Sequence, residues 1–411
     1  MVKVVGRLKL REELLAITLL SLVAFLGTLA FRLSIPAIAF YVRESLGATA
    51  LSVGLLTSSF FAARAVTATT AGILIDRLGL KRILNIVVML FITHGAVVVL
   101  YSMFSDIVHI TMLRAVQGIL NGISWVTIQV SLGILVPEKL RGRAYSIYFT
   151  SGSLGGVLGN NIYSLLAYNP LIQVLAISLL TFMLAGLLTM ALLLIFKSRL
   201  RGVVRGSSKA GFNYLSVIKC LRDVLLVIIV ALGLSMFTSF IRGDLSYVYV
   251  SESLGIGRDV ATNLIAFASL TALILGYMFS WMADKYNDLI ALRISTFTAM
   301  LGIIMLSMPY VVTIFLGIFM FSSGNSAVIA IARRVAVSSK VKGLAVGVIN
   351  TMSNIGMVSG SLIIGYLYDV IGLSPVISQG IIMFKLPLIA GIPTLIALVM
   401  TLALKRGEPN T

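Results

Sequence analysis

The sequence predicts an all-α membrane protein in which twelve transmembrane helices form two pseudo-symmetric six-helix bundles. Of its 411 residues, 59% are hydrophobic and only 11% are charged, with a mean hydropathy of +1.07. A water-soluble chain of this length would need more polar surface to cover its apolar interior. The chain also repeats itself, because Glu44-Ser45-Leu46-Gly47 returns as Glu252-Ser253-Leu254-Gly255 and Asp76 returns as Asp284, both 208 positions later. Two motifs with one spacing indicate two parallel halves.

The expected helices follow from the lengths of the apolar segments. A membrane-spanning helix needs about 20 mostly apolar residues, and charge clusters with Gly and Pro mark the breaks between helices. The twelve segments are 14–42, 48–75, 83–103, 107–136, 143–168, 171–196, 223–251, 258–283, 289–308, 311–335, 343–369 and 380–404. We therefore expect an N-terminal bundle at 1–196, a basic, Gly- and Ser-rich cytoplasmic linker at 197–222, and a C-terminal bundle at 223–411.

The basic residues predict the orientation of the chain in the membrane. Of the 32 lysines and arginines, 25 lie in the two termini or in, or within a few residues of, alternate connections between the expected spans. Because cytoplasmic loops carry the excess of positive charge, we expect a multi-pass protein of the cell membrane with both termini in the cytoplasm. The net charge of +18 then reflects topology and anionic lipid headgroups, and no nucleic-acid partner is expected.

Enzyme chemistry is not expected from this inventory of residues. One cysteine and two histidines cannot build a Cys/His metal site, and the chain has no GxxxxGK[ST] phosphate loop. We therefore expect no metal, no cofactor and no enzymatic activity.

A glycine- and arginine-rich segment after the second expected helix carries a family resemblance. It reads Gly72-x-x-x-Asp76-Arg77-x-Gly79-x-Lys81-Arg82, with a weaker copy that ends at Asp284-Lys285. This segment resembles the loop between helices 2 and 3 of the major facilitator superfamily, and the resemblance extends over essentially the whole chain. It implies a latch that holds the cytoplasmic side shut, in which Gly72 allows close approach of a neighbouring helix and Asp76 pairs with cations across the halves. A simple topology anchor is the alternative.

Two further motifs resemble those of the same superfamily. Arg114-Ala-Val-Gln117-Gly118 is similar to its second motif, whose intramembrane arginine is linked to proton coupling in relatives. An arginine in hydrocarbon is costly, so Arg114 should face the interior or water, unless it snorkels to the membrane edge.

The second of these motifs is a small-residue pattern. Gly155 and Gly159 belong to a degraded form of a motif associated with antiporters, and Gly356 and Gly360 repeat the spacing in the eleventh helix. A gating role and plain helix packing both explain this spacing.

Charged residues within the expected spans suggest how a cargo or a proton is bound. Arg32, Arg64 and Arg242 are suited to an anion, because a desolvated arginine forms strong charge-assisted hydrogen bonds, although Arg32 also resembles a structural arginine of drug-exporter-like members. Asp244 is the one acid expected within the outer half of a span and is the candidate proton carrier. A salt bridge between Asp244 and Arg242 is its alternative role.

Polar residues of several helices are candidates for lining a central cavity. Asn121, Trp125 and Gln129 recur at i, i+4 and i+8, on one face of a helix. The other candidates are Asn160, Tyr247, Asn325, Asn350 and Asn354. Hydrogen bonding between helices is an equally good explanation, because polar atoms within a membrane must find partners.

Together these features favour a secondary transporter in which two bundles rock around a central small-molecule site. Proton-coupled efflux by a monomer in the lipid bilayer, similar to drug-exporter-like members, is our first interpretation. An organic-anion or organophosphate carrier that uses the intramembrane arginines is the alternative. A membrane sensor or scaffold that does not transport is a more remote one.

Overall fold

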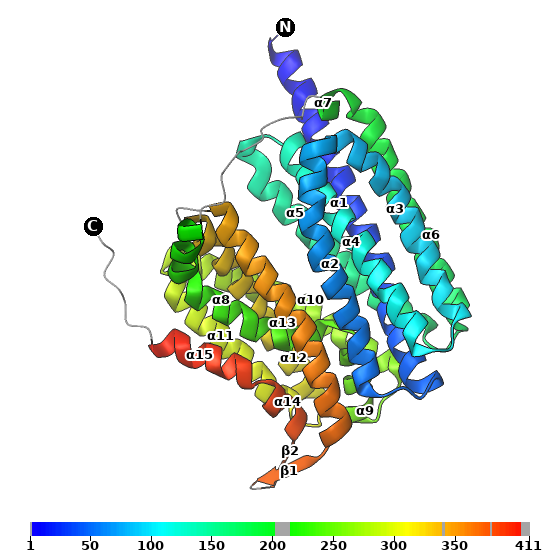
Figure 1. The fold of residues 1–411 in the computed structure, drawn as a ribbon, viewed down its shortest axis with the longest axis vertical. Coiled ribbons are helices and arrows are strands. Elements are labelled where there is room, and N and C mark those ends of the chain that lie inside the picture. Colours follow the sequence, from blue (N-terminus) through cyan, green and yellow to red (C-terminus); the bar gives the residue numbers. More distant parts are fainter. Residues whose placement is uncertain (1, 202–213, 339–341, 379, 404–411) are drawn as a thin grey trace. The chain divides into compact units, whose positions relative to one another are not determined.

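The computed structural model describes residues 2–201, 214–338, 342–378 and 380–403, which are almost entirely helical (Figure 1). The chain divides into two compact units. The first contains Met1–Leu46 and Ser59–Lys209, and the second contains Gly47–Ser58 and Ala210–Thr411. The boundary at Ser58 falls inside one helix, so the first two turns of that helix belong to the second unit.

The first unit is built from long apolar helices joined by short turns. Its elements are α1 (Val2–Phe40) with a π-helical turn (Tyr41–Ser45), α2 (Ala50–Leu78), α3 (Leu80–Leu100) with a 3₁₀ turn (Tyr101–Met103), α4 (Ile107–Leu135), α5 (Glu138–Leu166), α6 (Leu171–Ile195) and α7 (Lys197–Arg201). Helix α1 packs on α5 and α6, and α3 packs on α6. Gly79, with φ of +83°, makes the tight reversal between α2 and α3.

The second unit repeats this plan with one broken helix and a small hairpin. Its elements are α8 (Tyr214–Arg242), α9 (Leu245–Leu254), α10 (Arg258–Lys285), α11 (Asp288–Leu306), α12 (Val311–Ser338), α13 (Lys342–Ile371), β1 (Pro375–Ser378), β2 (Ile381–Phe384), α14 (Lys385–Ala390) and α15 (Ile392–Ala403). Helix α8 packs on α13, and α11 packs on α12. The first residues of α2 join this unit.

The predicted fold class is confirmed, and eleven of the twelve expected segments each correspond to one helix or one bent helix pair. By length and apolar composition, nine helices within the described residues can cross a membrane, or ten if α8 and α9 form one bent span. Helix α5 falls outside this set, as its glycines, serines and asparagines lower its hydropathy. Helix α15 falls outside because its described part has 12 residues.

Two expected helices differ from the structure. The segment 223–251 is not one helix, because α8 and α9 are bent by 64° at Gly243 and Asp244. A side chain at Gly243 would lie 2.2 Å from the carbonyl oxygen of Ser239, so only glycine fits this break. The segment 380–404 does not begin as a helix either. Its first residues form β2, which pairs antiparallel with β1 through the turn at Gly380, φ +79°.

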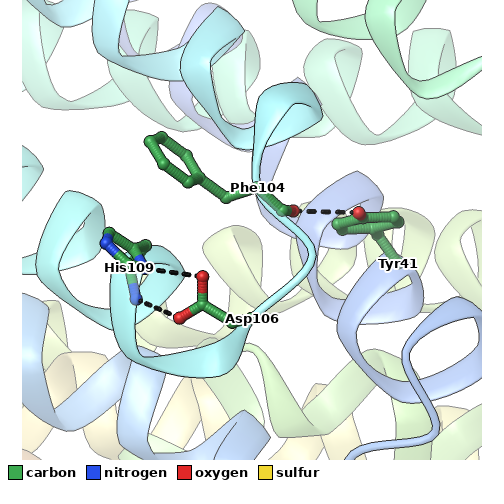
Figure 2. A network of polar contacts seen from close by, with 4 residues as sticks. All are labelled: Tyr41, Phe104, Asp106 and His109. Atoms are coloured by element: carbon green, nitrogen blue, oxygen red, sulfur yellow. Dashed lines mark hydrogen bonds and ion pairs between the residues drawn. The ribbon is translucent and has the colours of Figure 1, made fainter.

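The connection between α3 and α4 is held by polar contacts within the first unit (Figure 2). Asp106 is the N-cap of α4 and accepts a hydrogen bond from the backbone N–H of His109 at 3.0 Å. Its second oxygen lies 2.5 Å from His109 Nδ1, and the hydroxyl of Tyr41 donates to the carbonyl oxygen of Phe104 at 2.9 Å. The N–H of His109 holds the pKa of Asp106 below its ordinary value.

Candidate functional site

Each unit contains one helix pair that packs backbone against backbone through glycines. In the first unit, a Cβ at Gly155 or Gly159 of α5 would lie 2.1 or 2.5 Å from a carbonyl oxygen of α1. In the second, a Cβ at Gly356 or Gly360 of α13 would lie 2.8 or 2.1 Å from a carbonyl oxygen of α8. These four glycines are therefore sites of close helix contact, whatever part they take in gating.

The first unit has a buried arginine in α4. Arg114 of α4 is 2% exposed, so it faces the protein interior and does not snorkel. Its guanidinium carbon lies 5.2 Å from the ring centre of Phe31 and 5.5 Å from that of Phe60, and its Nη1 donates to Gln117 Oε1 at 2.9 Å. Tyr101 donates to the same oxygen at 2.8 Å. Two aromatic faces and one amide oxygen thus stabilise this cation away from bulk water.

The three residues expected on one face of α4, Asn121, Trp125 and Gln129, lie in different environments. Asn121 is buried on the same side as Arg114, whereas the ring of Trp125 packs against Gly27 of α1 and edge-to-face on Phe91 of α3. Gln129 is half-buried, and its backbone carbonyl accepts a hydrogen bond from Tyr145. In this structure Trp125 is a packing residue, and Asn121 is the member of the line that belongs with the buried arginine.

The remaining candidates of the first unit lie on three helices. The stem of Arg32 in α1 runs over Gly156 and Gly159 of α5, and the guanidinium of Arg64 in α2 lies 5.8 Å from the ring centre of Phe61. Asn160 of α5 is buried. Arg32 and Arg64 are half-buried.

The second unit has a buried carboxylate at its helix break. Asp244 is 1% exposed and immediately precedes α9. The hydroxyl of Thr57 in α2 donates to Asp244 Oδ2 at 2.7 Å and accepts the backbone N–H of Asp244 at 2.9 Å. The N-terminus of α9 also favours a negative charge at this position. Sequence reasoning found Asp244 but missed Thr57, since nothing local links residues 187 positions apart.

The other candidates of the second unit lie at different depths. Arg242 is exposed, and its Nη2 donates to Ser326 Oγ of α12 at 3.3 Å. The next residue, Asn325, is 1% exposed, and neither of its amide atoms has a hydrogen-bond partner among the described residues. Tyr247 is buried, Asn354 is half-buried and Asn350 is exposed.

A second carboxylate of this unit fixes the start of α2. Both oxygens of Asp369, at the end of α13, accept backbone N–H groups of α2, from Ala50 at 2.7 Å and from Leu51 at 2.8 Å. Gly365, one turn earlier in α13, brings the two backbones together, because a Cβ there would lie 2.9 Å from the carbonyl oxygen of Ala50. Asp369 therefore caps the N-terminus of α2.

The expected latch residues are only partly described. The side chains of Asp76 and Asp284 lie outside the described part of the chain. A Cβ at Gly72 would meet no described atom within 4 Å. Arg77 and Arg82 are exposed, Lys81 is half-buried, and Lys285 lies 4.9 Å from the ring centre of Trp281.

No group of three or more His, Cys, Asp or Glu side chains comes together to hold a metal ion, as far as the described residues show. The polar chemistry described in the two units is that of hydrogen bonds and charged side chains. The first unit offers a buried cation and amides, and the second offers a buried acid at a helix break.

Comparison with known proteins places this arrangement in a family. A sequence model of the Major Facilitator Superfamily matches residues 20–336 and, in a second match, 224–411. An uncharacterized MFS-type transporter of Methanocaldococcus jannaschii is 23% identical over 350 residues, which are 82% of this chain and 87% of the relative.

Solved structures show the same fold. The crystal structure of the nucleoside transporter NupG has a TM-score of 0.73 at 13% identity, covering 94% of this chain and 98% of that one. A bacterial homologue of the human lysosomal transporter Spinster, inward-facing and unoccupied, has a TM-score of 0.67 at 14% identity, covering 95% and 94%. The fold supports secondary transport by alternating access. This chain belongs to the Major Facilitator Superfamily.

Proposed function

We propose that this protein is a proton-coupled efflux transporter of a small molecule, in which Asp244 gains and loses the proton. The observation that carries the proposal is a 1%-exposed aspartate at the break between α8 and α9. Transporters often build ion and substrate sites at broken helices, because the interrupted backbone supplies polar groups within the membrane. A buried carboxylate at such a break is suited to a change of charge during a transport cycle.

The contacts of Asp244 connect its charge to the position of α2. The ionised carboxylate accepts the Thr57 hydroxyl, and the N-terminus of α9 stabilises the charge, while burial opposes it. Protonation removes the charge, so it weakens the attraction to both groups. Loading a proton would then loosen Asp244 from Thr57, which is a direct route from proton binding to movement of α2.

The remaining parts of the proposal concern the moving bodies and their orientation. We propose that 1–196 and 223–411 rock against each other, with 197–222 as the linker, in a cell membrane and with both termini in the cytoplasm. The excess of basic residues on alternate connections supports this orientation. The efflux direction is supported by the motif at Gly155 and Gly159, which resembles that of antiporters. The cytoplasmic latch at Asp76 and Asp284 belongs to the same proposal.

A pH-gradient experiment in proteoliposomes tests the role of Asp244. Candidate cargoes, among them lipophilic cations and organic anions, are screened with and without an imposed gradient. Asp244→Asn is expected to abolish accumulation driven by the gradient but to retain counterflow exchange of labelled for unlabelled cargo, because exchange needs no net proton release. Asp106→Asn, which changes an exposed acid of the first unit, is the matched control and should behave as wild type. Accumulation by Asp244→Asn at the wild-type level would contradict the proposal.

An anion carrier remains a second candidate because of Arg242. An exposed arginine at the end of a spanning helix is costly in hydrocarbon, so Arg242 is suited to a water-filled cavity that admits an anion. Arg242→Gln, and likewise Arg32→Gln, should then abolish transport of anionic cargo and spare neutral or cationic cargo. Equal loss for every class of cargo would assign the arginines a structural role.

A further inference from the structure

Three buried polar side chains form a stripe along α4 inside the first unit. Gln117, Asn121 and Ser124 follow one another at i, i+4 and i+7, so they lie on one face of the helix within two turns. Their exposed fractions are 0%, 5% and 2%. One polar atom of each has no hydrogen-bond partner among the described residues, namely Gln117 Nε2, Asn121 Oδ1 and Ser124 Oγ.

The orientation of the Gln117 amide is set by its neighbours. Its Oε1 accepts hydrogen bonds from Arg114 Nη1 at 2.9 Å and from the Tyr101 hydroxyl at 2.8 Å. A guanidinium has no acceptor, so the amide oxygen, not the nitrogen, must face Arg114. Gln117 Nε2 is therefore a donor, Asn121 Oδ1 one turn further on is an acceptor, and Ser124 Oγ can be either.

The other buried hydroxyl groups of α4 have hydrogen-bond partners. Thr127 donates to the carbonyl oxygen of Ile123 and Ser131 donates to that of Thr127, both at 2.8 Å. Ser124 makes no such bond to its own helix among the described residues. Leaving a buried polar group without a partner destabilises the fold, so three neighbouring ones call for a bound group that satisfies them.

We propose that this stripe is a binding site for hydroxyl groups, supplied either by ordered water or by a hydroxyl of the cargo. A hydroxyl can accept from Gln117 Nε2 and donate to Asn121 Oδ1 at the same time. An ammonium group cannot accept from Gln117, and a carboxylate cannot donate to Asn121. The cargo source rests on the proposed transport function, whereas the water source does not. The site lies within one unit and involves no residue of the Asp244 break.

An experimental structure of the full chain in lipid nanodiscs tests the site and distinguishes the two sources. Two maps are compared, one without added solute and one with D-ribose as a polyhydroxylated probe. We expect a density peak about 2.7–3.2 Å from at least two of the three atoms. A single peak present in both maps identifies water, and density that appears or extends only with ribose identifies a cargo hydroxyl. Two maps without density at this place would overturn the proposal.

A stability measurement gives a second test, in which the direction of the change in melting temperature decides whether the site is occupied. If a hydroxyl is bound, Ser124→Ala removes one of its partners and should lower the apparent melting temperature by about one to two degrees. If the stripe is dry, the same change removes an unsatisfied hydroxyl and should raise the melting temperature or leave it unchanged, which would refute the site. Ser131→Ala, at a buried hydroxyl that is bonded to its own helix, is the matched control. These two measurements do not involve Asp244. The proposal of a hydroxyl-binding site can therefore be refuted while proton coupling holds, and proton coupling can be refuted while the site holds.

Discussion

The two units pack helices in the same way but bury side chains of opposite charge. In both, glycines four residues apart press one helix against the backbone of another, α5 on α1 and α13 on α8. The first unit then buries the cation of Arg114 between two aromatic rings. The second buries the carboxylate of Asp244 at a broken helix. The comparison indicates that the repeat preserves the scaffold, while the chemistry of each half is set by a few side chains.

The two charges are stabilised by different means. Arg114 gains about 0.5–2 kcal/mol from each favourable ring contact when water is excluded, and a charge-assisted bond to Gln117. Asp244 depends on the Thr57 hydroxyl and on the N-terminus of α9. An arginine stays protonated at any physiological pH, whereas a carboxylate can change its charge. The first unit therefore holds a permanent charge, and the second holds the carboxylate on which the proposed proton coupling depends.

The largest loss of stability is expected at the glycine contacts between helices, which both units share. Gly159→Ala and Gly360→Ala each place a methyl group within 2.5 Å of a backbone carbonyl oxygen, which cannot move without shifting a helix. Each change should destabilise its own unit by about 1–3 kcal/mol or more. Thermal unfolding of the purified protein in detergent measures this. Gly142→Ala, where a methyl group has open space among the described residues, is the control, and equal melting temperatures for all three variants would break the comparison.

A smaller effect is expected from Arg114→Lys. Lysine keeps the charge but loses the planar group that stacks between Phe31 and Phe60 and binds Gln117. We expect a loss of about 1–2 kcal/mol in stability and a strong decrease in transport rate. Arg143→Lys, at an exposed arginine of the same unit, serves as the control. Wild-type transport by Arg114→Lys would show that only the charge matters at this position.

The sequence predicted the helices well because apolar length determines a span. It failed at Gly243, since apolar segments lie on both sides of the break and the contact of Gly243 with Thr57 is tertiary. The hairpin at 375–384 was missed because its Ile- and Val-rich strands are also apolar enough for the start of a helix. Apolar composition alone does not distinguish a short strand from a helix.

Residues of the site were predictable where their chemistry is unusual in a membrane. Arg114 and Asp244 were found because charged residues within spans are rare. Thr57 and Asp369 were not, since a threonine is ordinary in such a helix and an acid at a helix end is common. Their importance comes from partners 187 and 319 positions away, which periodicity cannot reveal. Spacing shows which face Trp125 occupies, but it could not show that its ring packs on Phe91 and against Gly27.

The two units also cap their helices differently, and Asp369→Asn tests the long-range cap. Asp369 of α13 binds the first N–H groups of α2 with both oxygens, so the amide should lose one acceptor and the favourable charge at a helix N-terminus. We expect a destabilisation of about 0.5–1 kcal/mol. Hydrogen exchange of the Ala50 and Leu51 amides should be faster in the variant, and exchange across α10 should not change. Unchanged protection at the start of α2 would show that the cap contributes nothing.

The smallest effect is expected at the local cap of the first unit. Asp106 is exposed, and the N–H of His109 keeps its pKa below the ordinary aspartate value. A carboxylate with a lowered pKa in the folded state stabilises the fold above its unfolded pKa, and this contribution is lost as the pH falls through the folded pKa. In Asp106→Asn, this pH-dependent contribution to stability should be absent. Exchange of the His109 amide, compared between wild type and variant at each pH, should show protection in wild type near neutral pH that disappears on acidification below about pH 4.

Because one exposed group is involved, global stability should hardly change, in contrast to Asp369→Asn. If the two proteins instead differ by a constant factor at every pH, the charge of Asp106 does not contribute, and the hydrogen bond alone makes the cap.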